Sequence, residues 1–205
     1  IYTLSLHDAL PISISIGESA FLNCKSLDNV VLPNQLTSIS DRLFGGCFSL
    51  KNIKIPSNVT IIGSESFTNT SLDSIVLPDT VTSIGDSAFR GCESLKKISI
   101  PENVTEIGVN PFAQSGVKQV ICKTGYFETD GNALYNKGKT HLISQYSEVN
   151  HYIIPNGVVS IGEHALYNCP FLQFISIPNS VIRVGTKVFF GGYHIKSVYV
   201  PKGAK

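Results

Sequence analysis

The sequence lacks several features by which common classes of protein are recognised. Its 205 residues include no Met and no Trp, and charged residues make up only 15% of the chain. The 16 Lys and Arg residues are nearly balanced by 15 Asp and Glu residues, whereas a dedicated nucleic-acid binder is usually strongly basic. No apolar run approaches the roughly 20 residues of a membrane-spanning helix. We therefore expect no nucleic-acid partner and no membrane insertion of this segment.

Motifs that carry chemistry are absent as well. The five His residues show no H-x-x-x-H or H-E-x-x-H spacing, and the five Cys residues show no C-x-x-C spacing, so no zinc site is expected. There is no Gly-rich phosphate loop, no G-x-S-x-G turn and no paired-carboxylate constellation. These absences predict a protein that is not an enzyme, with no catalytic residue, no cofactor and no metal.

The missing Met also bears on the two ends of the sequence. Because no secretory leader is visible either, we interpret the sequence as part of a longer chain, and localisation cannot be read from a leader. Residues 1–13 do not carry the repeat described below and resemble the translation of sequencing-adapter DNA. We interpret them as an artefact; a native capping element is the alternative. The far end shows no polar cap, which terminal repeats need, so we expect further chain there.

What the sequence does have is a repeat. An apolar-x-apolar-Pro tetrad recurs, and its prolines are spaced by 22 or 23 residues, apart from one step of 54. An Ile-Gly pair and a column of Phe follow the same period, and self-similarity of this length is the signature of a solenoid. The tetrads begin at residues 30, 53, 75, 98, 152, 175 and 198, and the aromatic column is Phe21, Phe44, Phe67, Phe89, Phe112 and Phe189, with Leu166 standing in once.

Each unit is typical of one turn of a coil. The two apolar residues of the tetrad face the same side of a strand, and the Pro ends the strand because it cannot donate to a ladder. One unit cannot bury its apolar face alone, but stacked units bury a continuous core. We interpret the Ile-Gly segment as the turn that follows the strand, with positive φ at the Gly.

This unit resembles the BspA-like, or Treponema pallidum type, class of leucine-rich repeats. The repeating unit of that class has the pattern I-P-x-x-V-T-x-I-G-x-x-A-F-x-x-C-x-x-L-x-x-I-x. Residues 79–100 (DTVTSIGDSAFRGCESLKKISI) match it nearly throughout, and the resemblance covers roughly residues 14–203. It implies an α/β fold, namely a right-handed leucine-rich-repeat solenoid with one short parallel strand per repeat of about 23 residues. It also implies an extracellular or cell-surface location, because family members are mostly such proteins and several are implicated in adhesion.

The spacing predicts one continuous solenoid interrupted by an insert. Repeats 1–5 are expected at 14–122 and repeats 6–7 at 155–205, with the insert at 123–154. Within the insert, residues 133–143 (ALYNKGKTHLI) predict a β-hairpin with a Gly-containing turn. The insert is the most aromatic stretch of the chain, which leaves two interpretations open. It forms a small satellite core against the solenoid, which we favour, or a protruding recognition element.

Four of the cysteines share one column of the repeat. We predict that they are buried free thiols that pack as small hydrophobes. Only Cys24 and Cys47 lie in adjacent repeats, so at most one disulfide could connect neighbouring turns. The column consists of Cys24, Cys47, Cys92 and Cys169, and Cys122 occupies a strand position expected to lie in the core.

The strand face opposite the core is where a solenoid usually binds. One interpretation of its irregular columns is a solvated face; the other is a mixed basic and apolar patch that docks a protein. The candidate protein-binding residues are Lys51, Lys54, Val76, Lys96, Lys97, Lys118, Phe174 and Tyr199.

Together these features predict a non-enzymatic interaction or adhesion module of a secreted or cell-surface protein. The expected partner is a protein ligand, such as a host or cell-surface protein. The alternative is a passive structural spacer within a longer multidomain protein. The repeat itself does not decide between them, because its regular residues specify a scaffold.

Overall fold

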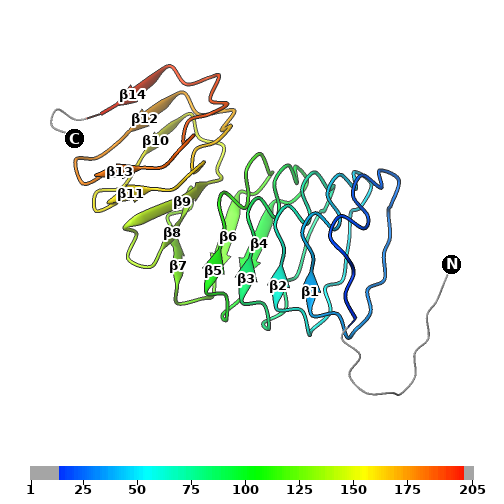
Figure 1. Cartoon of the computed structure of the whole chain (residues 1–205). Helices are drawn as coiled ribbons and strands as arrows, with labels where there is room; N and C mark the ends of the chain where they lie inside the picture. Colours follow the sequence, from blue (N-terminus) through cyan, green and yellow to red (C-terminus); the bar gives the residue numbers. More distant parts are fainter. Residues whose placement is uncertain (1–13, 201–205) are drawn as a thin grey trace.

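The computed structural model describes residues 14–200, which wind into two stacks of turns (Figure 1). The first stack, residues 14–122, runs from blue to green in Figure 1, and the second stack, residues 141–200, runs from yellow to red. The two stacks meet at an angle, at the segment that was predicted as the insert. Residues 1–13, interpreted above as an artefact or a cap, lie outside the described residues.

Two segments of each turn align with the same segments of the next turn. The Ile-Gly segments of the first stack form a parallel sheet with the order β1-β2-β3-β5, in which Ile39 pairs with Ile62 and Ile62 with Ile84. The tetrads contribute a second parallel pair, β4-β6. The strands are β1 (Ser38–Ile39), β2 (Ile61–Ile62), β3 (Ser83–Ile84), β4 (Lys97–Ile100), β5 (Glu106–Ile107) and β6 (Gln119–Cys122).

The prediction of a single strand per repeat is wrong. The tetrads at 30–33, 53–56 and 75–78 contain no regular strand, although the first and third residue of each tetrad are buried or partly buried. The Ile-Gly segment, which was predicted as a turn, carries the ladder instead. The amide of Gly63 donates to Ile39 O at 2.8 Å, and that of Gly85 donates to Ile62 O at 2.7 Å. Each turn therefore offers two strand positions.

The α/β class is also wrong, because no residue between 14 and 200 is helical. In the segment that follows the Ile-Gly position, where an α/β fold would have a helix, backbone N–H groups donate to carbonyls of the next turn. Phe44 N donates to Ser66 O at 2.9 Å. Gly46 N donates to Thr68 O at 2.7 Å. A helix needs these donors for carbonyls four residues back in the same segment, so the lateral bonds replace it and the described chain is an all-β solenoid.

The insert supplies the first turn of the second stack. β9 pairs in parallel with β11, which places Leu142 beside Ile161, and β10 pairs with β12. The predicted hairpin is present, because β8 and β9 are antiparallel, and β7 adds a third antiparallel strand. The strands are β7 (Phe127–Thr129), β8 (Ala133–Asn136), β9 (His141–Gln145), β10 (His151–Ile153), β11 (Ser160–Ile161), β12 (Phe174–Ser176), β13 (Arg183–Val184) and β14 (Ser197–Tyr199).

The hairpin packs into the core instead of protruding from it. Ala133, Leu134 and Tyr135 are fully buried. Leu134 belongs to the hydrophobic cluster of the first stack, whereas Ala133 and Tyr135 belong to that of the second. The strand β8 therefore joins two cores, in agreement with the favoured interpretation of the insert.

A column of phenylalanine rings runs through the first stack. From Phe21 to Phe112, neighbouring ring centroids lie 5.6–6.1 Å apart in stacked orientation. The column ends at Phe112, which Tyr146 meets edge-on at 6.4 Å. The ring stack therefore stops where the two stacks of turns meet.

The five cysteines are free thiols, and no two of them form a disulfide. Cys47, Cys92 and Cys169 are buried, which confirms the prediction for these three. Cys24 is exposed and Cys122 is partly exposed.

The Gly of the Ile-Gly pair allows close packing of turns and does not have positive φ. A Cβ on Gly85 would lie 2.5 Å from Ser64 N in the preceding turn, whereas at Gly17 it would meet nothing within 4 Å. Positive φ occurs two residues later at non-Gly positions such as Glu65 (φ 54°) and Ser87 (φ 51°). The predicted role of this Gly is therefore wrong; backbone contact between turns is the reason for it.

Candidate functional site

The face of the first three tetrads on which their middle residues are exposed carries a groove. It is called the strand-face groove here, after the predicted strands. It has a volume of about 820 Å³ and is lined by the segments 29–34, 52–57 and 74–78. Val31 and Val76 are 90% and 81% exposed on it. Lys54 occupies the same register position in the turn between them. Exposed apolar residues with polar residues around them are typical of interaction sites.

Three of the predicted lysines are available on this face. Lys51, Lys54 and Lys97 are exposed, and within residues 14–200 none of them forms an ion pair. Of the three, Lys54 lines the strand-face groove. Their charges are therefore open to a partner.

Two other predicted lysines are engaged within the chain. Lys118 Nζ lies 3.0 Å from Glu148 Oε2, which neutralises its charge locally. Lys96 Nζ donates to the backbone carbonyl of Glu93 at 2.5 Å. Neither side chain lines the strand-face groove, which weakens their assignment to it.

Phe174 and Tyr199 lie on the second stack. In the ladder between β12 and β14, Tyr199 pairs with Ser176, and the ring of Phe174 meets His151 edge-on at 6.1 Å. The sheet β10-β12-β14 is not hydrogen-bonded to β4-β6. The eight predicted residues are therefore split between the two stacks and do not form one continuous ladder face.

Sequence reasoning missed the polar residues that join the two stacks. Asn110 Nδ2 donates to the backbone carbonyl of His164 at 2.8 Å, and Ser144 Oγ donates to Asn110 Oδ1 at 2.5 Å. Asn110 and Ser144 are both buried. The strands β5 and β9 belong to different sheets and are not hydrogen-bonded to each other. These side-chain bonds connect the two stacks at this position.

Gln145 occupies the position of the phenylalanine column at this point. The backbone N–H of Gln145 donates to Ala165 O in the next turn at 2.8 Å. The backbone N–H of Phe44 donates in the same way to Ser66 O. Cys169 Sγ donates to Gln145 Oε1 at 3.0 Å. The search for an apolar column could not find this residue, because the insert interrupts the period and the residue is polar.

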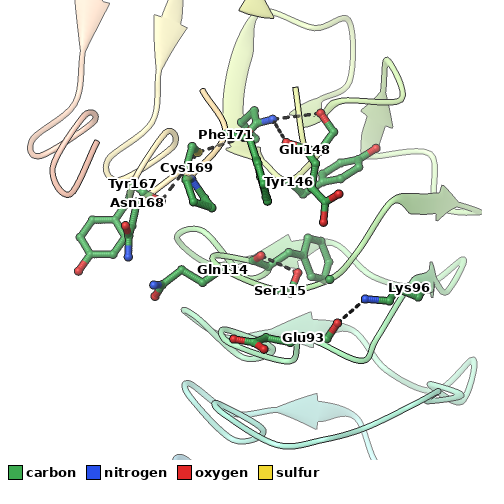
Figure 2. Close-up of a pocket in the computed structure, with 15 residues that line it drawn as sticks. Glu93, Lys96, Gln114, Ser115, Tyr146, Glu148, Tyr167, Asn168, Cys169 and Phe171 are labelled. Carbon is green, nitrogen blue, oxygen red and sulfur yellow. Dashed lines mark hydrogen bonds between the residues drawn. The ribbon is translucent and has the colours of Figure 1, made fainter. Parts of the chain in front are cut away.

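A shortened turn opens a cavity beside Gln145, here called the junction notch. Seven positions separate Phe112 from Gln119 in the preceding turn and eight separate Leu166 from Phe174 in the next, but only six separate Gln145 from His151, the equivalent pair in the insert. The shorter turn reaches less far and leaves about 410 Å³ open between its neighbours. The lining residues come from four segments, 93–96, 112–116, 145–148 and 167–171, which surround the notch in Figure 2.

The titratable groups of the described residues give no sign of a metal centre. Within residues 14–200, no group of three or more His, Cys, Asp or Glu residues could hold a metal ion. Burial raises the pKa of Cys92 to about 11 and that of Cys169 to about 12, so both thiols stay protonated at neutral pH. Burial, followed by the nearby charge of Arg183, lowers the pKa of His141.

The described part of the chain contains no helix long and apolar enough to cross a membrane.

Comparison with solved structures identifies similar proteins. A leucine-rich cell surface protein from Faecalibacterium prausnitzii is 31% identical, with a TM-score of 0.77 over 90% of this chain and 50% of that one. A leucine-rich repeat protein from Bacteroides ovatus is 29% identical, with a TM-score of 0.57 over 90% of this chain and 58% of that one. The pneumococcal vaccine antigen PcpA, 22% identical with a TM-score of 0.73 over 83% of this chain and 44% of that one, shares the fold.

The chain spans about half the length of these solved structures. No curated protein sequence matches it. The family model for the BspA type leucine rich repeat region matches in six copies, over residues 14–141 and 143–205. The repeated unit, the two-ladder solenoid and this match agree, and the chain belongs to the BspA-type leucine-rich repeat family.

Proposed function

We propose that this chain is a non-enzymatic protein-binding module of a secreted or cell-surface protein, and that it binds through the strand-face groove. The observation that carries the proposal is the exposure of Val31 and Val76 on either side of Lys54. Burying apolar surface of this kind is the main favourable term in protein association. A passive spacer has no need for such a surface.

The charges around the groove indicate the chemistry of the partner. Lys51, Lys54 and Lys97 are exposed and, within residues 14–200, form no ion pair. A partner that fits presents an apolar contact for the two valines, with carboxylates around it. Rim charges mainly speed association and lose their effect in salt, so binding slows as ionic strength rises.

A surface location is supported by the comparison with known proteins. The F. prausnitzii relative is described as a cell surface protein. For a protein-binding module at the cell surface, the proposed role is adhesion to a host or cell-surface protein. This chain covers 50% of that relative's length. The location and the role are proposed for the protein as a whole.

An array of purified secreted and cell-surface proteins tests the proposal. The chain is expected to bind at least one acidic protein on the array, and the double variant Lys54→Glu, Val76→Glu is expected to weaken that binding by about tenfold or more, equal to about 1.4 kcal/mol. Both side chains are exposed, so the variant should fold.

The matched control is Lys137→Glu, a charge reversal in the turn between β8 and β9, where the Lys is also exposed. It should bind like the parent chain. Equal binding by the double variant and the control would exclude the strand-face groove. Failure of the chain to bind any protein on the array would favour the spacer.

A further inference from the structure

The junction notch is a second cavity that protein binding on the strand face does not use. None of its lining residues belongs to the strand-face groove. Its volume of about 410 Å³ lies within the roughly 300–1,000 Å³ of small-molecule sites. The turns before and after it bound it on two sides (Figure 2), which suits a compact ligand better than an extended peptide.

The charges of the notch favour a neutral ligand. Glu93, Glu148 and Lys96 are the charged residues that line it. Glu148 is paired with Lys118 at 3.0 Å, and Lys96 Nζ is bonded to the backbone of Glu93. One carboxylate and one ammonium remain, so the notch has no strong excess of either sign that would select an anion or a cation.

Free polar atoms at the notch match a ligand rich in hydroxyl groups. The Glu93 carboxylate and the Asn168 side-chain amide have no hydrogen-bond partner within residues 14–200, and both residues line the notch. Gln114 Oε1 accepts from Arg90 Nε at 3.0 Å, which leaves its Nε2 free to donate. A hydroxyl both donates and accepts, so it can bond to each of these groups.

An exposed aromatic ring supplies an apolar contact at the same place. Phe171 lines the notch, is 51% exposed and, within residues 14–200, packs against no other aromatic ring. A ligand that presents a flat row of C–H groups can cover this ring and remove apolar surface from water.

We propose that the junction notch binds a pyranose sugar. A pyranose is neutral, carries hydroxyl groups around its ring and presents an apolar C–H face. Its C–H face packs on Phe171, and its hydroxyls bond to Glu93, Asn168 and Gln114. The site is independent of the strand-face groove, so a glycan and a protein could be bound together.

Saturation-transfer NMR of the whole chain with free glucose, galactose, mannose and N-acetylglucosamine tests the proposal. At least one of these sugars is expected to receive saturation, with the strongest effect on its ring C–H protons. Sorbitol, which has the hydroxyls but no pyranose ring, is the matched control ligand and should receive none. Equal transfer to sorbitol, or none to any sugar, would overturn the proposal.

Two variants locate the site. Phe171→Ala and Glu93→Ala are each expected to raise the Kd of the bound sugar by about tenfold. Phe48→Ala removes a ring of equal exposure, 50%, from a turn far from the notch and should leave the Kd unchanged. A Phe171→Ala chain that binds like Phe48→Ala would contradict the assignment. The Lys54→Glu, Val76→Glu variant should still bind the sugar, which keeps this test separate from that of the strand-face groove.

Discussion

Asn110 Nδ2 lies 2.8 Å from the backbone carbonyl oxygen of His164, a residue 54 positions further along the chain. The bond crosses from the first stack to the second, at the point where the backbone ladder of Ile-Gly segments is interrupted. A buried amide side chain therefore does here what backbone hydrogen bonds do between other turns. The effect of removing this bond should therefore be measurable.

Replacing Asn110 by Gly is expected to destabilise the chain by about 1–3 kcal/mol, because the buried Ser144 hydroxyl and the partly buried His164 carbonyl lose their bond. Gly is chosen because Asn110 has positive φ (46°), which Gly adopts without strain. Urea denaturation measures the effect.

The matched control is Asn69→Gly, at an exposed Asn with a similar φ of 56° and no side-chain hydrogen bond to any residue between 14 and 200. Its free energy of unfolding should change by no more than about 0.5 kcal/mol. Equal effects at the two positions would mean that the Asn110 bonds contribute nothing.

Gly85→Ala is expected to cost about 1–3 kcal/mol, because the new Cβ would lie 2.5 Å from Ser64 N and force two turns apart. Gly17→Ala, where the Cβ would meet nothing within 4 Å, should change stability by less than about 0.5 kcal/mol. Thermal denaturation of the two variants distinguishes close packing from the positive φ that the sequence suggested. Equal losses would contradict the packing explanation.

Phe67→Ala is expected to destabilise the chain by about 3–5 kcal/mol, because Phe67 is fully buried between two stacked rings, each 5.6 Å away. The exposed Phe48 is the control, and its replacement by Ala should cost less than about 0.5 kcal/mol. Chemical denaturation provides the comparison. A loss at Phe67 no larger than at Phe48 would show that the ring column does not stabilise the solenoid.

The period of the sequence predicted the columns but not the secondary structure within them. The apolar residues of the tetrads, the Ile-Gly pairs and the Phe column are regular because each contacts its own copy in the next turn, and such contacts leave a pattern. Whether a segment becomes strand, turn or helix depends on where its amides bond, as at Phe44, and the pattern does not record that.

The strand-face residues could be identified from the register, and Val76 is as exposed as expected. The junction notch could not be identified, because it lies beside a turn that is one or two residues shorter than its neighbours and beside the polar Gln145 in an apolar column. These features break the repeat, so a search for the repeat passes over them.

The buried thiols give a prediction for alkaline pH. Desolvation raises the pKa of Cys92 to about 11 from an ordinary value of 9.0, so the unfolded chain loses this proton first. Its contribution to stability is present below pH 9 and is lost as the pH rises to about 11. Denaturation between pH 9 and 11 should show a smaller decline for Cys92→Ala than for the parent chain. An equal decline would contradict the assignment.

Thiol labelling of the native chain checks the burial of the cysteines directly. Cys24, which is exposed, should react with a maleimide at pH 7.5 at a rate close to that of a free thiol. Cys92 and Cys169 should react only after unfolding, because they are buried and protonated. Rapid native labelling of Cys169 would indicate that the junction of the two stacks opens.

The most direct test of protein binding through the strand-face groove is a hydrogen-exchange footprint of the chain bound to a protein captured from the array. Protection is predicted at residues 29–34, 52–57 and 74–78, which line the groove. The hairpin turn at 137–139 should exchange as in the free chain. Protection confined to the hairpin turn or to the second stack, with residues 52–57 unchanged, would contradict the account.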